Sequence, residues 1–64
     1  MTLRDLVLTI DADEKLMIRR LGESEMLECT PPEILNEYET LHDVTVSTVW
    51  VSYSLYKALM IIIE

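Results

Sequence analysis

The acidic side chains that lie closest together in the sequence are the first candidates for chemistry. Asp11, Asp13 and Glu14 follow directly after a stretch with helical spacing. Carboxylate oxygens bind Mg²⁺ or Ca²⁺, but calcium loops of the common type need further ligands and a mid-loop glycine, which this segment lacks. If copies of the cluster converged in an oligomer, two-metal nuclease chemistry would be an alternative. We interpret the segment as a solvated turn and assign no metal site.

Other side chains with catalytic potential occur alone. Cys29 is the only cysteine and His42 the only histidine, which leaves two soft ligands where a zinc site prefers four. We expect Cys29 to be a small buried side chain in a strand and His42 to follow a helix end. A single glycine, Gly22, excludes a glycine-rich phosphate loop, and the serines lack a nucleophile motif. We therefore predict a protein that is not an enzyme and binds no cofactor.

Charge is the strongest compositional signal. The chain has 12 acidic and 5 basic residues, a net charge of −7, and no Lys or Arg between Leu21 and Tyr56. Such a balance disfavours direct binding of DNA or RNA, because phosphate neutralisation drives that binding, and it disfavours an anionic membrane. It favours a basic protein partner, although a solvated helix face is the alternative interpretation of the acids after Cys29. We assign partner binding to Glu33, Glu37, Glu39, Asp43, Asp11, Asp13 and Glu14.

The elements that position these residues can be inferred from periodicity. The chain is expected to be one α+β domain, residues 1–64, of order α-β-β-α-β-β, with one mainly antiparallel four-stranded sheet and two short helices. The expected helices lie at 3–10 and 31–39, and the expected strands at 15–21, 25–29, 43–54 and 56–64.

Local signals support these boundaries. Thr2 is a candidate N-cap with Asp5 three residues later, and Thr30 with Glu33 forms a capping box around two prolines. Gly22 is the expected site of positive φ in the turn between the first two strands. A switch in the alternation of the third strand predicts a β-bulge near 47–48.

The apolar residues of the last strand predict self-association. Residues 58–63 have no polar alternation, whereas two short helices can cover only one face of a four-stranded sheet. The open face would then expose an apolar surface, which is typical of an interface. We predict a homo-oligomer whose interface contains Trp50, Tyr53, Met60 and Ile62.

The order of these motifs resembles a known group of proteins. The matching segments are Leu3-Arg4-Asp5-Leu6, Ile10-Asp11-Ala12-Asp13, Pro32-Glu33-Ile34-Leu35 and Ile61-Ile62-Ile63-Glu64. Together they resemble small accessory proteins of phages and prophages of Gram-positive bacteria, some of which inhibit host defences, including CRISPR nucleases. The chain departs from that pattern at 58–60, where more polar turn residues would be expected. The resemblance implies a mobile-element accessory protein and supplies no catalytic residues.

These observations lead to one expected function and two alternatives. The expected function is a phage-encoded inhibitor that presents its acidic surface to a basic, nucleic-acid-binding host defence protein. An oligomer that sequesters a small nucleotide-type signal is the first alternative; it would depend on the cations Arg4, Arg19, Arg20 and Lys57. A DNA-nicking protein is the weaker alternative. No secretory signal or membrane span is visible, and one unpaired cysteine fits a reducing compartment, so we expect the host cytoplasm.

Overall fold

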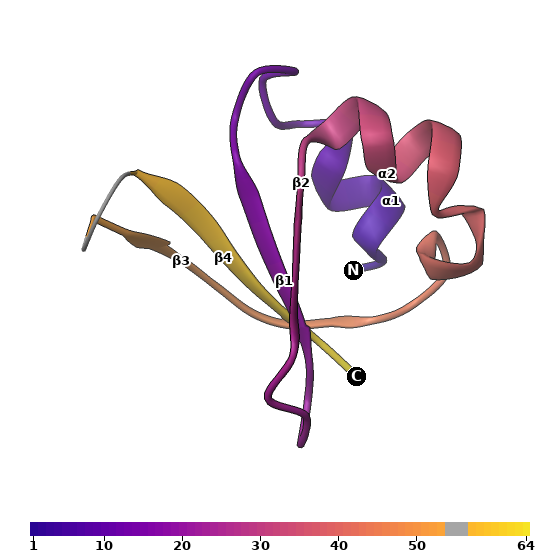
Figure 1. The fold of residues 1–64 in the computed structure, drawn as a ribbon. Helices are drawn as coiled ribbons and strands as arrows, with labels where there is room; N and C mark the ends of the chain where they lie inside the picture. Colours follow the sequence, from indigo (N-terminus) through magenta and orange to yellow (C-terminus); the bar gives the residue numbers. More distant parts are fainter. Residues whose placement is uncertain (54–56) are drawn as a thin grey trace.

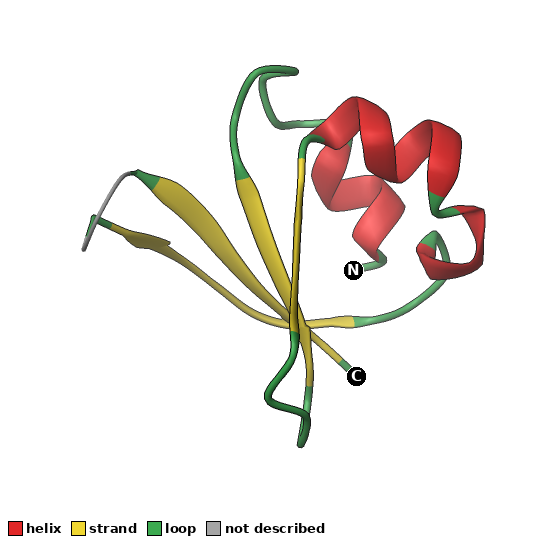
Figure 2. Cartoon of the chain, in the orientation of Figure 1, coloured by secondary structure: helices red, strands yellow, loops and turns green. Residues whose placement is uncertain are grey.

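The computed structural model describes residues 1–53 and 57–64 as two layers, with both helices on one face of a sheet (Figures 1 and 2). The order of helices and strands along the chain confirms the predicted α-β-β-α-β-β, with one 3-10 helix in addition. Both helices are shorter than predicted, and residues 54 and 56 of the predicted strands lie outside the described ranges. The elements are α1 (Leu3–Val7), β1 (Leu16–Arg20), β2 (Met26–Cys29), α2 (Pro31–Glu37), η1 (Glu39–Leu41), β3 (Val46–Ser52) and β4 (Ala58–Ile63).

The sheet is mixed, with strand order β2-β1-β4-β3. The β1–β2 and β3–β4 pairs are antiparallel, as predicted, but β1 and β4 are parallel. The prediction of a mainly antiparallel sheet therefore holds for the two outer pairs and not for the centre. A physical reason is that the most apolar strand, β4, gains most from a central position, where both of its edges are hydrogen-bonded.

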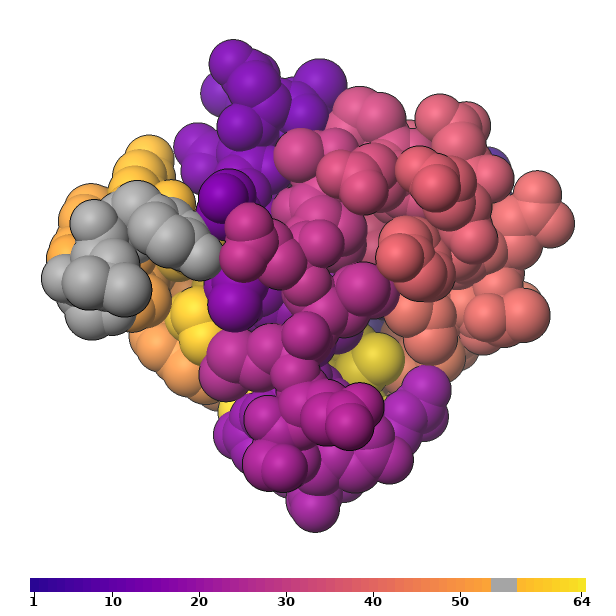
Figure 3. Space-filling view, in the orientation of Figure 1, coloured from indigo at the N-terminus to yellow at the C-terminus, as the bar shows by residue number. Residues whose placement is uncertain are grey.

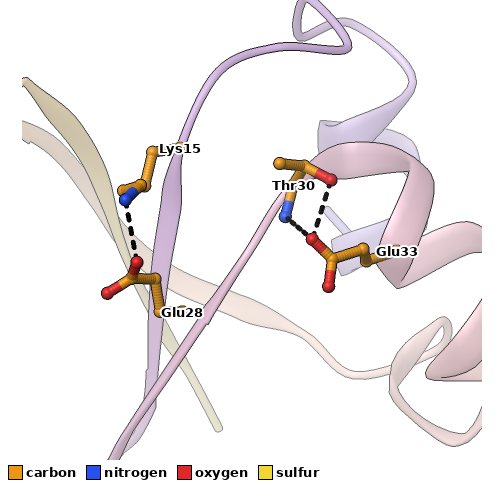
Figure 4. A network of polar contacts seen from close by, with 4 residues as sticks. All are labelled: Lys15, Glu28, Thr30 and Glu33. Carbon is orange, nitrogen blue, oxygen red and sulfur yellow. Dashed lines mark hydrogen bonds and ion pairs between the residues drawn. The ribbon is translucent and has the colours of Figure 1, made fainter.

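Local sequence signals fold as predicted. The Oγ1 of Thr2 accepts a hydrogen bond from the Asp5 amide at 3.2 Å. One carboxylate oxygen of Glu33 accepts from the Thr30 amide at 3.2 Å, as in the predicted capping box, and also accepts from the Thr30 hydroxyl at 3.1 Å (Figure 4). Gly22 has a φ of 87°. The register shifts between Val46 and Thr48, where the bulge was expected.

The core lies between the helices and one face of the sheet. Alternate residues of β1 and β4 point toward the helices, so that Ile18 pairs with Ile61 across the parallel ladder. Full burial of each such aliphatic side chain contributes about 1.5–3 kcal/mol. The buried cluster consists of Leu3, Val7, Leu16, Ile18, Cys29, Ile34, Ile61 and Ile63.

The N-terminal segment joins the helix layer to the sheet edge. The Leu3 amide donates to the Val44 carbonyl at 2.9 Å, and the Val46 amide donates to the Met1 carbonyl at 2.9 Å. Thr2 forms an isolated antiparallel bridge with Thr45. The N-terminal segment therefore covers the outer edge of the sheet only as far as Val46, the first residue of β3.

Three of the four predicted interface residues share the sheet face opposite the helices. Trp50 pairs with Met60, and Thr48 pairs with Ile62, so these side chains point to one side. Trp50 is 42% exposed, while Met60 and Ile62 are half-buried. Tyr53 follows the end of β3 and is 71% exposed. Their role in an oligomer stays a prediction.

Candidate functional site

Three of the predicted site residues are exposed where α2 ends and η1 follows. Glu37 ends α2, Glu39 begins η1, and Asp43 follows η1; all three are exposed. We call these three residues the α2–η1 acidic surface. This part of the chain forms the salmon-coloured side of the molecule in Figure 3.

An open hollow borders this surface between α1 and the α2–η1 segment. Its lining combines the apolar side chains of Leu8 and Leu35 with the charged groups of Arg4, Glu39 and Asp43. With two carboxylates against one guanidinium, the lining has a net negative charge. His42 also lines the hollow. A positively charged side chain from a partner would be attracted here, and a small anion would be repelled.

His42 follows the end of η1, as expected, and its ring contacts the last turn of α2. Its Nε2 lies 2.9 Å from the carbonyl oxygen of Ile34. Because a carbonyl can only accept a hydrogen bond, Nε2 carries the proton and donates it. The ring thereby fixes the end of η1 against α2 and positions the acids on both sides of it.

The lysines of the described chain are already paired with acids elsewhere. Lys15 forms an ion pair with Glu28 at 2.8 Å (Figure 4), and Lys57 forms one with Glu14 at 3.5 Å. Both pairs are exposed and contribute little stability, but they cancel charge locally. No ion pair within residues 1–53 and 57–64 involves the α2–η1 acidic surface.

Two arginines are also engaged. The Arg19 Nη1 donates to the backbone carbonyl of Glu23 at 2.9 Å, and the Arg20 Nη1 donates to the carbonyl of Glu64 at 3.0 Å. The predicted nucleotide pocket would need several cations directed into one site. Both of these arginines instead donate to backbone carbonyls, one in the turn after β1 and the other directly after β4.

The predicted partner-binding acids fall into three separate settings. Glu33 is half-buried, and its carboxylate holds the start of α2. Asp11 and Glu14 line a cavity of about 270 Å³ together with Lys57, and Asp13 is exposed in the same loop. The α2–η1 acidic surface forms the third setting and shares no residue with that cavity. Asp11 and Glu14 therefore line a different hollow from Glu39 and Asp43.

The loop carboxylates are not arranged as a metal site. Within the described residues there is no group of three His, Cys, Asp or Glu side chains placed to hold a metal ion. Glu14 is paired with Lys57. The structure thus offers no support for the two-metal arrangement considered from the sequence.

Cys29 is buried, as predicted, and is 3% exposed. Burial, with a further contribution from the nearby Glu33 carboxylate, raises the pKa of its thiol to about 11. A thiol of this kind stays protonated at neutral pH and is a poor nucleophile.

The face opposite the helices contains two further apolar residues that the sequence analysis did not assign to the interface. Met17 is partnered with Met60 across the parallel ladder, and Met26, on the edge strand β2, is 46% exposed. Met17 alternates with the buried Leu16 and Ile18, so strict period-2 alternation in β1 could have placed it on this face. The apolar surface thus extends across all four strands.

No helix in the described ranges is long and apolar enough to cross a membrane. No protein-family model, curated protein or solved structure matches this chain.

Proposed function

We propose that the protein is a non-catalytic binding protein whose α2–η1 acidic surface binds a basic protein. The observation that carries this proposal is the uneven pairing of charges. Four of the five cations contact groups elsewhere in the fold, whereas Glu37, Glu39 and Asp43 are exposed and unpaired within the described chain. A surface that keeps its negative charge in this way attracts and orients a basic partner.

The partner class follows from the shape of this surface. Glu39 and Asp43 line the same hollow as the apolar side chains of Leu8 and Leu35. Such a surface suits an Arg or Lys side chain, whose apolar stem would contact the leucines while its charged end contacts the carboxylates. Basic grooves of nucleic-acid-binding proteins present many such side chains. We propose a partner of this kind.

The resemblance to phage accessory proteins places the proposal in a biological setting. A protein that occupies the basic groove of a host defence nuclease would inhibit it by competing with nucleic acid. This activity needs no catalytic residue in the inhibitor, and it would take place in the cytoplasm of the infected cell.

The alternative of a sequestered nucleotide signal is less favoured by the charges at the hollow. Among the described residues that line it, Arg4 is the one Lys or Arg side chain, and Glu39 and Asp43 contribute two carboxylates. A phosphate placed there would meet more negative than positive charge.

A capture experiment tests the proposal. The tagged protein is incubated at low salt with a lysate of a Gram-positive bacterium, and retained proteins are identified by mass spectrometry. We expect a basic nucleic-acid-binding protein that is lost as salt is raised. We also expect the native protein to reduce nucleic-acid binding by that purified partner.

A charge-matched pair of variants makes the experiment specific. Replacing the acidic surface (Glu37→Gln, Glu39→Gln, Asp43→Asn) should weaken retention by at least about tenfold. The control (Asp5→Asn, Glu23→Gln, Glu25→Gln) removes the same number of exposed carboxylates elsewhere and should bind as the native protein does. Equal weakening by both variants would show that net charge, and not this surface, attracts the partner.

A further inference from the structure

The outer edge of β3 is the part of the fold that needs an additional partner. β3 is the last strand of the sheet, and within the described residues only its start is covered, by the N-terminal segment at Val46. From Thr48 to Ser52 the strand pairs with β4 on one side only. Five of its seven residues are exposed, including Val49 at 39% and Val51 at 42%.

Natural sheet edges are usually protected by charge, proline or a bulge. Between Asp43 and Lys57 the sequence contains no Asp, Glu, Lys, Arg or Pro. The bulge lies between Val46 and Thr48, before the uncovered part. β3 is thus an unprotected edge strand of high β-propensity, in a chain that is otherwise rich in charge.

The sequence of this uncovered part is close to symmetrical. Reading outward from Trp50, Val49 corresponds to Val51, and Thr48 corresponds to Ser52. In an antiparallel pair of two identical strands centred on residue 50, each residue lies opposite its counterpart in this series. Valine would face valine, threonine would face serine, and Trp50 would face Trp50 of the other copy.

We propose that two copies of this chain pair edge to edge through β3, antiparallel and centred on Trp50, to form one continuous sheet of two protomers. The interface is isologous, because the same residues contribute from both copies. Val49 and Val51 contact across the helix-covered face, since they pair with Ile61 and Leu59. The two Trp50 side chains contact on the opposite face and extend the surface formed by Met60.

The near-symmetry of residues 48–52 favours a second copy as the occupant, and the distribution of charge permits it at this edge. Each protomer has a net charge of −7, so two copies repel one another wherever acids meet. The uncharged segment between Asp43 and Lys57 is where close approach costs least. A basic partner's strand would gain no ion pair along this edge and would bind better at the acids of α2–η1.

Oligomeric state is the first test. Analytical ultracentrifugation of the full chain should give twice the monomer mass of 7.4 kDa at about 100 µM, well above the Kd of a stable interface. Raising the salt concentration should tighten the dimer, because salt screens the repulsion between the acidic protomers. A monomer mass at this concentration would overturn the proposal.

A pair of lysine variants distinguishes edge pairing from pairing through the open face. Trp50→Lys places two like charges opposite each other and should give a monomer. Met26→Lys introduces the same charge on the same face, at similar exposure, but on the far edge strand β2, and should remain a dimer. Dissociation by Met26→Lys with retention by Trp50→Lys would refute the β3 contact. Circular dichroism checks that each variant is folded.

Disulfide cross-linking tests the register even if Trp50→Lys fails to fold. Opposite Cα atoms in an antiparallel pair lie about 4.5–5.5 Å apart, within disulfide range. With oxidised glutathione, the double variant Thr48→Cys with Ser52→Cys should therefore form covalent dimers. Ser52→Cys alone should not, because its two copies would lie ~13 Å apart along the strands. Native Cys29 is buried and serves as the background control. Cross-linking of Ser52→Cys alone, or absence of cross-linking in the double variant, would show a different register and contradict the centre at Trp50.

Discussion

Cys29 provides a quantitative test of the core. It is the last residue of β2 and directly precedes the N-cap Thr30, and its thiol is 3% exposed. Burial, and then the Glu33 carboxylate, raises the pKa of this thiol from an ordinary value of 9.0 to about 11. The test raises the pH. Deprotonation of Cys29 in the folded chain would place a thiolate among the aliphatic side chains of the core, which disfavours the folded state.

The direction and size of the effect follow from proton binding. Below pH 9 both the folded and the unfolded chain hold the thiol proton, so the contribution of Cys29 to stability is constant. Between pH 9 and 11 the unfolded chain releases the proton while the folded chain retains it, so stability falls as pH rises. A shift of this size lowers the free energy of unfolding by about 2 kcal/mol at a pH of about 10.5. The total for a domain of this length is only about 3–10 kcal/mol, so the loss is measurable.

The assay compares urea unfolding of the native protein and Cys29→Ala at neutral pH and at a pH of about 10.5. Tyrosine and lysine residues also titrate at high pH, but they do so equally in both proteins, so the comparison isolates Cys29. We expect the native protein to lose about 2 kcal/mol more than the variant. Parallel losses would refute a buried, protonated thiol. A thiol reagent at neutral pH should modify native Cys29 only at denaturant concentrations that unfold the chain.

Two further predictions concern local structure. Thr30→Ala should lower the free energy of unfolding by about 1 kcal/mol through loss of the cap contact with Glu33. The control Thr40→Ala, in the exposed η1 segment, should change the urea midpoint little. Equal effects of the two substitutions would mean that the cap does not stabilise α2. Gly22→Ala should lower the free energy of unfolding, measured in urea, by about 1 kcal/mol, because Gly22 has a φ of 87°. This cost is one of backbone conformation, since the added Cβ would meet no atom within 4 Å. An unchanged urea midpoint would show that the turn adopts another conformation.

The elements whose signals are local could be predicted from the sequence. The capping residues Thr2 and Thr30, the turn at Gly22 and the bulge after Val46 each depend on a few neighbouring residues, and each was found where it was expected. The parallel pairing of β1 with β4 could not be predicted in this way. It joins strands far apart in the chain, and it is decided by competition among all possible strand orders and not by any short motif.

In the candidate site, too, local features could be predicted from the sequence, whereas the arrangement of distant residues could not. The exposure of Glu37, Glu39 and Asp43 is consistent with their place at the end of a short helix. The capping role predicted for Glu33 is confirmed, because its carboxylate accepts a hydrogen bond from the Thr30 amide. Whether acids distant in sequence share a surface depends on the packing of loops against the sheet. The separation of the Asp11–Glu14 loop from the α2–η1 acidic surface therefore emerged only from the structure.

The two proposed surfaces should respond to salt in opposite ways, and the reason lies in where the acids are placed. The α2–η1 acidic surface keeps unpaired carboxylates, so its attraction to a basic partner weakens as ions screen it. The β3 edge has no charge, yet it brings together two protomers of −7 each, so screening removes a repulsion and strengthens that contact. Salt titration of partner binding and of dimer mass, performed on the same preparation, therefore separates the two contacts without any substitution. If both weakened together, the β3 interface would have to contain ion pairs, which the residues between Asp43 and Lys57 cannot supply.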